Sequence, residues 1–214
     1  MMNPHLQDDL PSVSVPAPAA LSGLSRRTLL RRSAGGVAAL VLAPALTGLN
    51  GPAHAASLGS PAPALSLPGL DGATLDLATT PALKGKVVLV DFWASWCGPC
   101  RQSFPWMNLM QQRHGPRGLQ IVAVNVDRER ADADAFLRQF PSAFRIAFDA
   151  SGDTPRRWGA RAMPTSVLVG ADGRVLMQHE GFRPADQSKL EAAIEQAIAQ
   201  AVSPSALSSE RAGH

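Results

Sequence analysis

The sequence of 214 residues predicts one α/β domain whose sheet has a parallel centre and an antiparallel edge. Short apolar runs rich in β-branched residues alternate with helical patterns through the middle of the chain, which is typical of βαβ units. Asp-Gly pairs at 71–72 and 172–173 lie between apolar runs and predict one hairpin near each end of the domain. The expected order is therefore ββ, then βαβαβ, then ββα, with the parallel pairing in the middle.

The elements follow in order from these patterns. The run 87–93 is almost continuously apolar, as expected of a central strand buried on both faces. The helix after it should be kinked by Pro105 and ended by Gly115-Pro116. Apolar residues recur every four positions from Leu190 to Val202, which predicts a final amphipathic helix. The expected strands are 65–67, 74–77, 87–93, 119–126, 145–148, 166–169 and 175–177, and the expected helices are about 97–113, 131–140 and 190–202.

Residues 1–55 are interpreted as an export signal. Paired arginines at 26–27 precede the apolar stretch 34–49, which is typical of a twin-arginine signal. That stretch is short for a membrane span, which needs roughly 20 residues. Ala53-His54-Ala55 supplies a small-x-small cleavage site, so we expect a periplasmic mature chain that begins at Ala56. The alternatives are export by the Sec route and an uncleaved signal that anchors the chain to the inner membrane. The predicted organisation is a signal at 1–55, a domain at 56–202 and a flexible tail at 203–214.

The charge pattern argues against a nucleic-acid partner. The net charge is +3, but four of the 20 basic residues and two of the 17 acidic residues lie in residues 1–55. The remainder is close to neutral and has no basic stripe that would steer a polyanion. The chain has two cysteines, three positions apart, which excludes a multi-disulfide framework and a zinc site built from four cysteines.

Cys97-Gly98-Pro99-Cys100 follows directly on the predicted central strand and is expected to begin a helix. The free N–H groups and partial positive charge of a helix N-terminus favour a thiolate, so the pKa of Cys97 should be lowered. Pro99 is tolerated there because a first-turn residue has no helical acceptor for an N–H, and Gly98 leaves the sulfur of Cys97 uncovered. The pattern predicts dithiol redox chemistry: Cys97 attacks a substrate disulfide, and Cys100 resolves the mixed disulfide.

A structural or metal-binding role for the two cysteines is the alternative. Half of a zinc site needs a second pair of ligands. The histidines that could supply it are scattered along the chain, and no second C-x-x-C exists. The redox interpretation is therefore favoured. The scattered histidines are His114, His179 and His214.

The segment 88–101, with the sequence VLVDFWASWCGPCR, resembles the active-site segment of thioredoxins. Pro105 lies where that family kinks its first long helix, and the segment 158–165 (WGARAMPT) is similar to the one that carries its cis-proline. The predicted N-terminal hairpin and the segment 83–86 resemble the TlpA/ResA branch of membrane-linked or periplasmic reductases. The resemblance covers about residues 59–200. It implies a thioredoxin-like three-layer fold, with a central mixed sheet flanked by helices and an added N-terminal β-hairpin.

The resemblance also implies site residues around the cysteines. Asp91 lies in the apolar strand, where a buried carboxylate should have a raised pKa, and the family uses it to take the proton of Cys100. Pro164 should follow a cis peptide bond, which is a minor state of X–Pro bonds, and leave the backbone of Met163 free to pair with an extended substrate. Trp96 is expected to shield the sulfurs. The residues expected to bind substrate are Trp96, Gly98, Pro99 and Met163.

Two departures from the family pattern concern the surroundings of Asp91 and Cys100. Thioredoxins usually carry a lysine near the buried aspartate, and the matching position here is Ala123. The pKa of Asp91 should then be higher still. Many TlpA/ResA-type proteins carry an acid three residues after the second cysteine, where this chain has Ser103. The acid-assisted chemistry of those proteins is therefore not expected here.

The resemblance implies a monomeric periplasmic reductase. It would pass electrons from a membrane thiol donor of DsbD/CcdA type to oxidised envelope proteins, such as apocytochrome c or a copper-site protein. No cofactor or metal is expected beyond the Cys97–Cys100 disulfide, and the Gly-Pro spacer resembles that of strongly reducing members. The alternatives are a disulfide oxidase or isomerase, a thiol peroxidase, and a copper-binding or copper-site assembly module that uses the two sulfurs as soft ligands.

Overall fold

The computed structural model describes residues 56–202. The predicted export signal and the predicted tail lie outside the described residues, and their boundaries stay predictions. No helix within 56–202 has the length and apolar content to cross a membrane. The elements in chain order are β1 Ser66–Pro68, β2 Thr74–Asp76, β3 Val87–Trp93, α1 Cys100–His114, η1 Gly115–Arg117, β4 Leu119–Asn125, α2 Arg130–Gln139, β5 Arg145–Phe148, α3 Asp153–Arg157, β6 Thr165–Val169, β7 Val175–Glu180, η2 Pro184–Asp186 and α4 Gln187–Val202.

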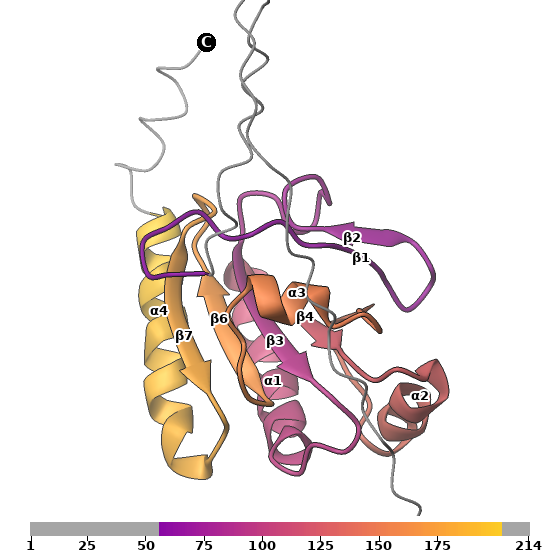
Figure 1. Ribbon diagram of the computed structural model, residues 1–214. Coiled ribbons are helices and arrows are strands. Elements are labelled where there is room, and N and C mark those ends of the chain that lie inside the picture. The colour runs from indigo at the N-terminus through magenta and orange to yellow at the C-terminus, as the bar shows by residue number, and fades with distance from the viewer. Residues whose placement is uncertain (1–55, 203–214) are drawn as a thin grey trace, which may run out of the picture. The chain divides into compact units, whose positions relative to one another are not determined.

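A five-stranded mixed sheet in the order β5-β4-β3-β6-β7 forms the centre of the domain (Figure 1). The pairs β3–β4 and β4–β5 are parallel, whereas β6 is antiparallel to both β3 and β7. Strands β1 and β2 form a separate antiparallel hairpin. The Asp-Gly turns of both hairpins use a glycine with positive φ, Gly72 and Gly173, a conformation that costs glycine little. The predicted fold class, including the added N-terminal hairpin, is confirmed.

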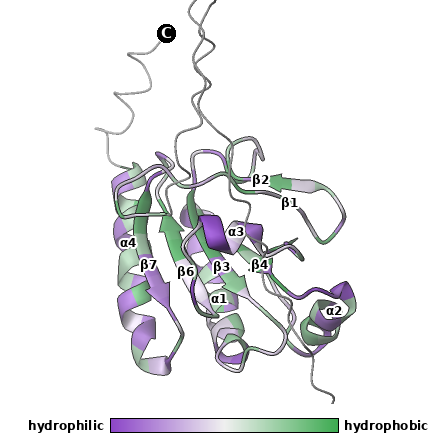
Figure 2. Cartoon of the chain, in the orientation of Figure 1, coloured by the Kyte–Doolittle hydropathy of each residue, from purple (hydrophilic) through white to green (hydrophobic). Residues whose placement is uncertain are grey.

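Side chains of β3 alternate between two apolar layers, so this strand is buried along its whole length. Leu89 and Trp93 point into the layer that α1 and α4 cover. Val90 and Phe92 point into the opposite layer, where they meet Trp158. Figure 2 shows the consequence: the central strands are mainly hydrophobic, whereas the helices carry mixed faces. Which face a residue of β3 points to therefore decides whether it lies beneath α1.

Two elements differ from the sequence prediction. Helix α1 begins at Cys100, three residues later than expected, because the Cys97 N–H bonds back to Ala94 O (3.1 Å) and closes a turn before the helix. Helix α3 was not predicted, since five residues are too short to show a helical period. Its start is instead set by Asp149, whose Oδ2 accepts from the N–H of Thr154 (2.7 Å).

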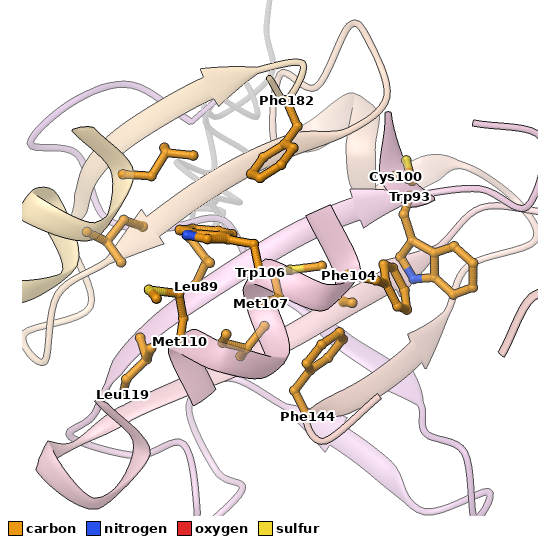
Figure 3. Close-up of a cluster of buried hydrophobic side chains, with 14 of the residues drawn as sticks. Leu89, Trp93, Cys100, Phe104, Trp106, Met107, Met110, Leu119, Phe144 and Phe182 are labelled. Carbon is orange, nitrogen blue, oxygen red and sulfur yellow. The ribbon is translucent and has the colours of Figure 1, made fainter. Parts of the chain in front are cut away.

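Helix α1 is fixed to the sheet by an aromatic cluster (Figure 3). The ring of Phe104 lies 4.8 Å from Trp93, 4.9 Å from Phe136 and 5.3 Å from Phe144, centroid to centroid. These pairs are edge-on, the arrangement that aromatic quadrupoles favour. Because Phe104 comes one turn after Cys100, the cluster also holds the start of α1 in place.

Replacing Phe104 with alanine should lower the free energy of unfolding by about 3–5 kcal/mol, because a fully buried ring is lost and a cavity is left behind. Urea unfolding of the oxidised protein measures the change. Leu109→Ala is the matched control on the same helix, since this side chain is 44% exposed, and it should cost less than about 1 kcal/mol. Equal losses in the two variants would contradict the assigned role of the cluster.

Candidate active site

The two cysteines form a disulfide where β3 passes into α1. Cys97 lies in the turn that ends β3, and Cys100 is the first residue of the helix. The N–H of Cys100 points at Sγ of Cys97, 3.2 Å away. A donor at the helix N-terminus is therefore already aimed at the sulfur on which a thiolate would form.

The surroundings distinguish the two sulfurs. Both cysteines are buried, Cys100 completely (0% exposed) and Cys97 almost completely (3%), but Cys97 is followed by the exposed residues Gly98 and Pro99. A side chain at position 98 would meet no atom within 4 Å, so the surface next to Cys97 is open at Gly98. The ring of Trp96 is 70% exposed and faces mostly solvent. Its expected contribution to substrate binding stays a prediction.

Asp91 lies in the middle of β3 and is fully buried. It points to the same face as Leu89 and Trp93, the face that α1 covers. Burial raises the pKa of Asp91 to about 7, against the opposing effect of a hydrogen bond from Ser166 Oγ to Asp91 Oδ1 (2.6 Å). Within residues 56–202, Oδ2 has no hydrogen-bond partner. The carboxyl group can therefore accept a proton at Oδ2 without losing a bond.

The register explains why nothing offsets this burial with a positive charge. Ala123 of β4 is the direct partner of Asp91 on one side, as the sequence predicted, and Ser166 of β6 is its partner on the other. Ser103, at the position where many TlpA/ResA-type proteins carry an acid, is also buried. Its hydroxyl is used within the helix, donating to Cys100 O (3.1 Å). Asp91 is thus the carboxyl group that lies in the layer beneath α1.

Pro164 follows a cis peptide bond, as predicted. Its carbonyl accepts from the N–H of Gly181 (2.7 Å), which ties this loop to the end of β7. The side chain of Met163 packs against the apolar cluster that contains both cysteines. Among the described residues, the backbone N–H and C=O of Met163 have no hydrogen-bond partner. They are free to pair with an added strand, although the catalytic and binding roles of the two residues stay predictions.

A polar network that the sequence did not reveal holds the loop before Cys97. Asp127 follows β4 and accepts two hydrogen bonds from Ser95, one from its N–H (2.9 Å) and one from its hydroxyl (3.0 Å). Asn125 donates a third to the same carboxylate (2.8 Å). The sequence contains one indication of this network. Asn125 and Asp127 lie at the carboxyl end of the next parallel strand, and the carboxyl ends of neighbouring parallel strands lie at the same edge of the sheet.

This chain is similar to thiol–disulfide oxidoreductases. The family model described as Redoxin matches residues 57–194. The Thiol-disulfide oxidoreductase ResA of Bacillus anthracis is 31% identical over 130 residues, which is 61% of this chain and 73% of that protein. The Thiol:disulfide interchange protein CycY of Rhizobium leguminosarum is 37% identical over 110 residues, 51% of this chain and 58% of that one. A crystal structure described as a thiol:disulfide interchange protein DsbE from Chlorobium tepidum superposes with a TM-score of 0.64 at 51% identity, covering 67% of this chain and 99% of that chain.

The buried carboxyl group should make the protein less stable as the pH rises. Below pH 3.8 Asp91 is protonated in both the folded and the unfolded chain. Between about pH 4 and 7 the unfolded chain loses the proton while the folded chain keeps it, so stability falls. Because the two pKa values differ by about three, the loss above pH 7 should reach about 4 kcal/mol.

Asp91→Asn removes this titration, so the stability of the variant relative to the wild type should increase steadily from pH 4 to pH 8. Urea unfolding of the oxidised proteins across that range measures the difference. Asp172→Asn is the control, because this exposed carboxylate should give a difference that is flat with pH. A flat difference for Asp91→Asn as well would contradict the raised pKa.

Proposed function

This chain belongs to the Redoxin family, as a ResA-type member of the thioredoxin superfamily and a thiol–disulfide oxidoreductase, and we propose that it acts as an exported reductase of envelope proteins. The observation that carries the proposal is the Cys97–Cys100 disulfide at the start of α1, above a buried carboxyl group whose pKa is about 7. A general base with such a pKa is suited to work near neutral pH.

The proposed cycle balances in electrons and protons. In the reduced protein, the Cys97 thiolate attacks one sulfur of a substrate disulfide and releases the other as a thiolate. Asp91 takes the proton of Cys100, and the new Cys100 thiolate attacks Sγ of Cys97. The substrate leaves with two thiols once its sulfurs have taken up protons. The two electrons that it gains come from Cys97 and Cys100, which are oxidised to the disulfide.

The cellular setting belongs to the same proposal. The paired arginines at 26–27 and the small-x-small site at 53–55 support export to the periplasm. The resemblance to TlpA/ResA-type reductases supports oxidised cysteine pairs of apocytochrome c or of copper-site proteins as substrates. It also supports a membrane thiol donor of DsbD/CcdA type, which would reduce the Cys97–Cys100 disulfide after each turnover.

The substrates should be captured by Cys100→Ser, because Cys97 can still attack a disulfide but nothing resolves the mixed disulfide. Covalent complexes from the periplasmic fraction, separated without reductant and identified by mass spectrometry, should include an apocytochrome or a copper-site protein. Cys97→Ser is the control and should capture nothing comparable. If Cys100→Ser forms no covalent complex that a reductant can cleave, the proposal is contradicted.

The direction of electron flow should be visible in the reduction potential. We expect a value below about −220 mV, on the scale where thioredoxin lies near −270 mV and the oxidant DsbA near −120 mV. Equilibration with glutathione and dithiothreitol buffers, followed by thiol trapping, measures it. A potential near that of DsbA would indicate an oxidase instead.

A further inference from the structure

Three polar side chains form a row across the sheet beneath α1 and α4. Asp91 of β3 is the register partner of Ser166 of β6, and Ser166 is the register partner of His179 of β7. Directly opposed residues of neighbouring strands point to the same face, and Ser166 points to Asp91, so all three share one face. Met177, two residues before His179, packs into the same apolar cluster. The row therefore runs from the buried centre of the sheet to its edge strand.

The outer end of the row lies at the protein surface. Nε2 of His179 is 3.4 Å from Oδ2 of Asp186, close enough for an ion pair, yet within residues 56–202 it has no hydrogen bond of acceptable geometry. Asp186 is bound in turn by Arg183, which is exposed to solvent. The register thus places Asp91, Ser166 and His179 on neighbouring strands in one row, and Asp186 lies next to His179 at the outer end.

Within residues 56–202, the other neighbours of Asp91 on this face of the sheet are apolar. Its neighbours along the same face of β3 are Leu89 and Trp93, and its partner on β4 is Ala123. From α1 the cluster receives Cys100 and Phe104, and the hydroxyl of Ser103 is engaged with Cys100 O. A carboxyl group that must gain and lose a proton in every cycle is therefore enclosed by apolar groups, except at Ser166.

We propose that Ser166 and His179 form the route by which Asp91 exchanges its proton with solvent. This inference rests on the proposed function, in which Asp91 takes the proton of Cys100. The Ser166 hydroxyl turns away from Asp91 Oδ1 and passes its proton to the His179 ring, while the carboxylic acid of Asp91 rotates so that its proton faces Ser166 and gives that proton to Oγ. Asp91 is left as a carboxylate and His179 as an imidazolium, which then loses its proton to water. Opposed residues have Cβ atoms about 4.5–5.5 Å apart, so rotation of the hydroxyl or one bridging water completes the step.

The charges around His179 suit this role. Asp186 and Arg183 face it from η2 and the preceding loop, and Ser166 faces it from β6. Hydrogen bonding and charge from Arg183 hold the pKa of Asp186 below its ordinary value, so Asp186 places a negative charge 3.4 Å from Nε2 of His179. The nearby α4 residues that enter the same cluster, Leu190 and Ala193, are apolar. Ser166 and His179 are accordingly positioning and relay residues, since neither touches the sulfurs.

The test is a pH jump on the oxidised protein, from pH 5 to pH 9 in dilute buffer. Time-resolved infrared spectroscopy follows the carboxylic-acid band that Asp91→Asn abolishes. In His179→Gln the band should decay about 100-fold more slowly, at the lower end of what a positioned proton-transfer group contributes. Added imidazole should restore most of the rate. Ser166→Thr keeps the hydroxyl and should behave as wild type, whereas Ser166→Ala should be slow.

Glu180→Gln is the matched control, because it removes an exposed charge from the neighbouring position of β7 and should leave the decay unchanged. Decay in His179→Gln at the wild-type rate would overturn the route. So would slow decay that imidazole does not restore, because a merely structural effect would not respond to a diffusible proton carrier. The pH jump needs no substrate, so its result is independent of the capture experiment. If the pH jump supports the route but Cys100→Ser captures no protein, the proton route is correct and the proposed reductase cycle is wrong.

Discussion

The enclosure of one carboxyl group in an apolar strand constrains the rest of this site. Asp91 lies on β3, which is buried on both faces, and within residues 56–202 its side chain receives a single hydrogen bond, from Ser166. The buried carboxyl group is costly to the fold in its charged form. The aromatic cluster around Phe104 offsets that cost and also holds Cys100 and α1 over the carboxyl group. Stability and reactivity are therefore set by the same packing.

The turn that carries Cys97, whose sulfur is proposed to attack the substrate, is held by residues at the end of β4. Ser95 is bound twice by Asp127, and Asn125 holds Asp127 in turn. This network fixes the turn that carries Cys97, whereas Phe104 fixes the helix that begins with Cys100. The two sulfurs are thus attached to different supports. A dithiol that opens and closes in every cycle benefits from this arrangement, because each sulfur keeps its own support in both states.

Much of this arrangement could be predicted from the sequence, and the rest could not for identifiable reasons. The continuous apolar run of β3 predicted a central strand, and the place of Asp91 in that run predicted a buried carboxyl group with a raised pKa. The C-x-x-C spacing predicted the paired cysteines next to the start of a helix, whereas the part that each residue takes in the reaction stays a prediction. The pairing of Asp91 with Ser166 depends on the antiparallel register of a strand 75 residues away, which no local pattern specifies. Asp127 likewise acts through a contact 32 residues distant. The start of α1 was misplaced because a turn at Cys97 replaces the first helical turn.

The two departures from the family pattern have a common consequence. A lysine opposite Asp91 would supply a buried positive charge, and an acid in place of Ser103 would supply a second proton acceptor near Cys100. This chain has Ala123 and a serine whose hydroxyl is already used. In the proposed cycle Asp91 then takes the proton of Cys100, and within residues 56–202 the hydrogen-bond partner of Asp91 is Ser166. The polar row toward His179 lies on the side of Asp91 opposite Ala123, so the substitutions that isolate the carboxyl group on one side leave the edge strand β7 as its connection to solvent.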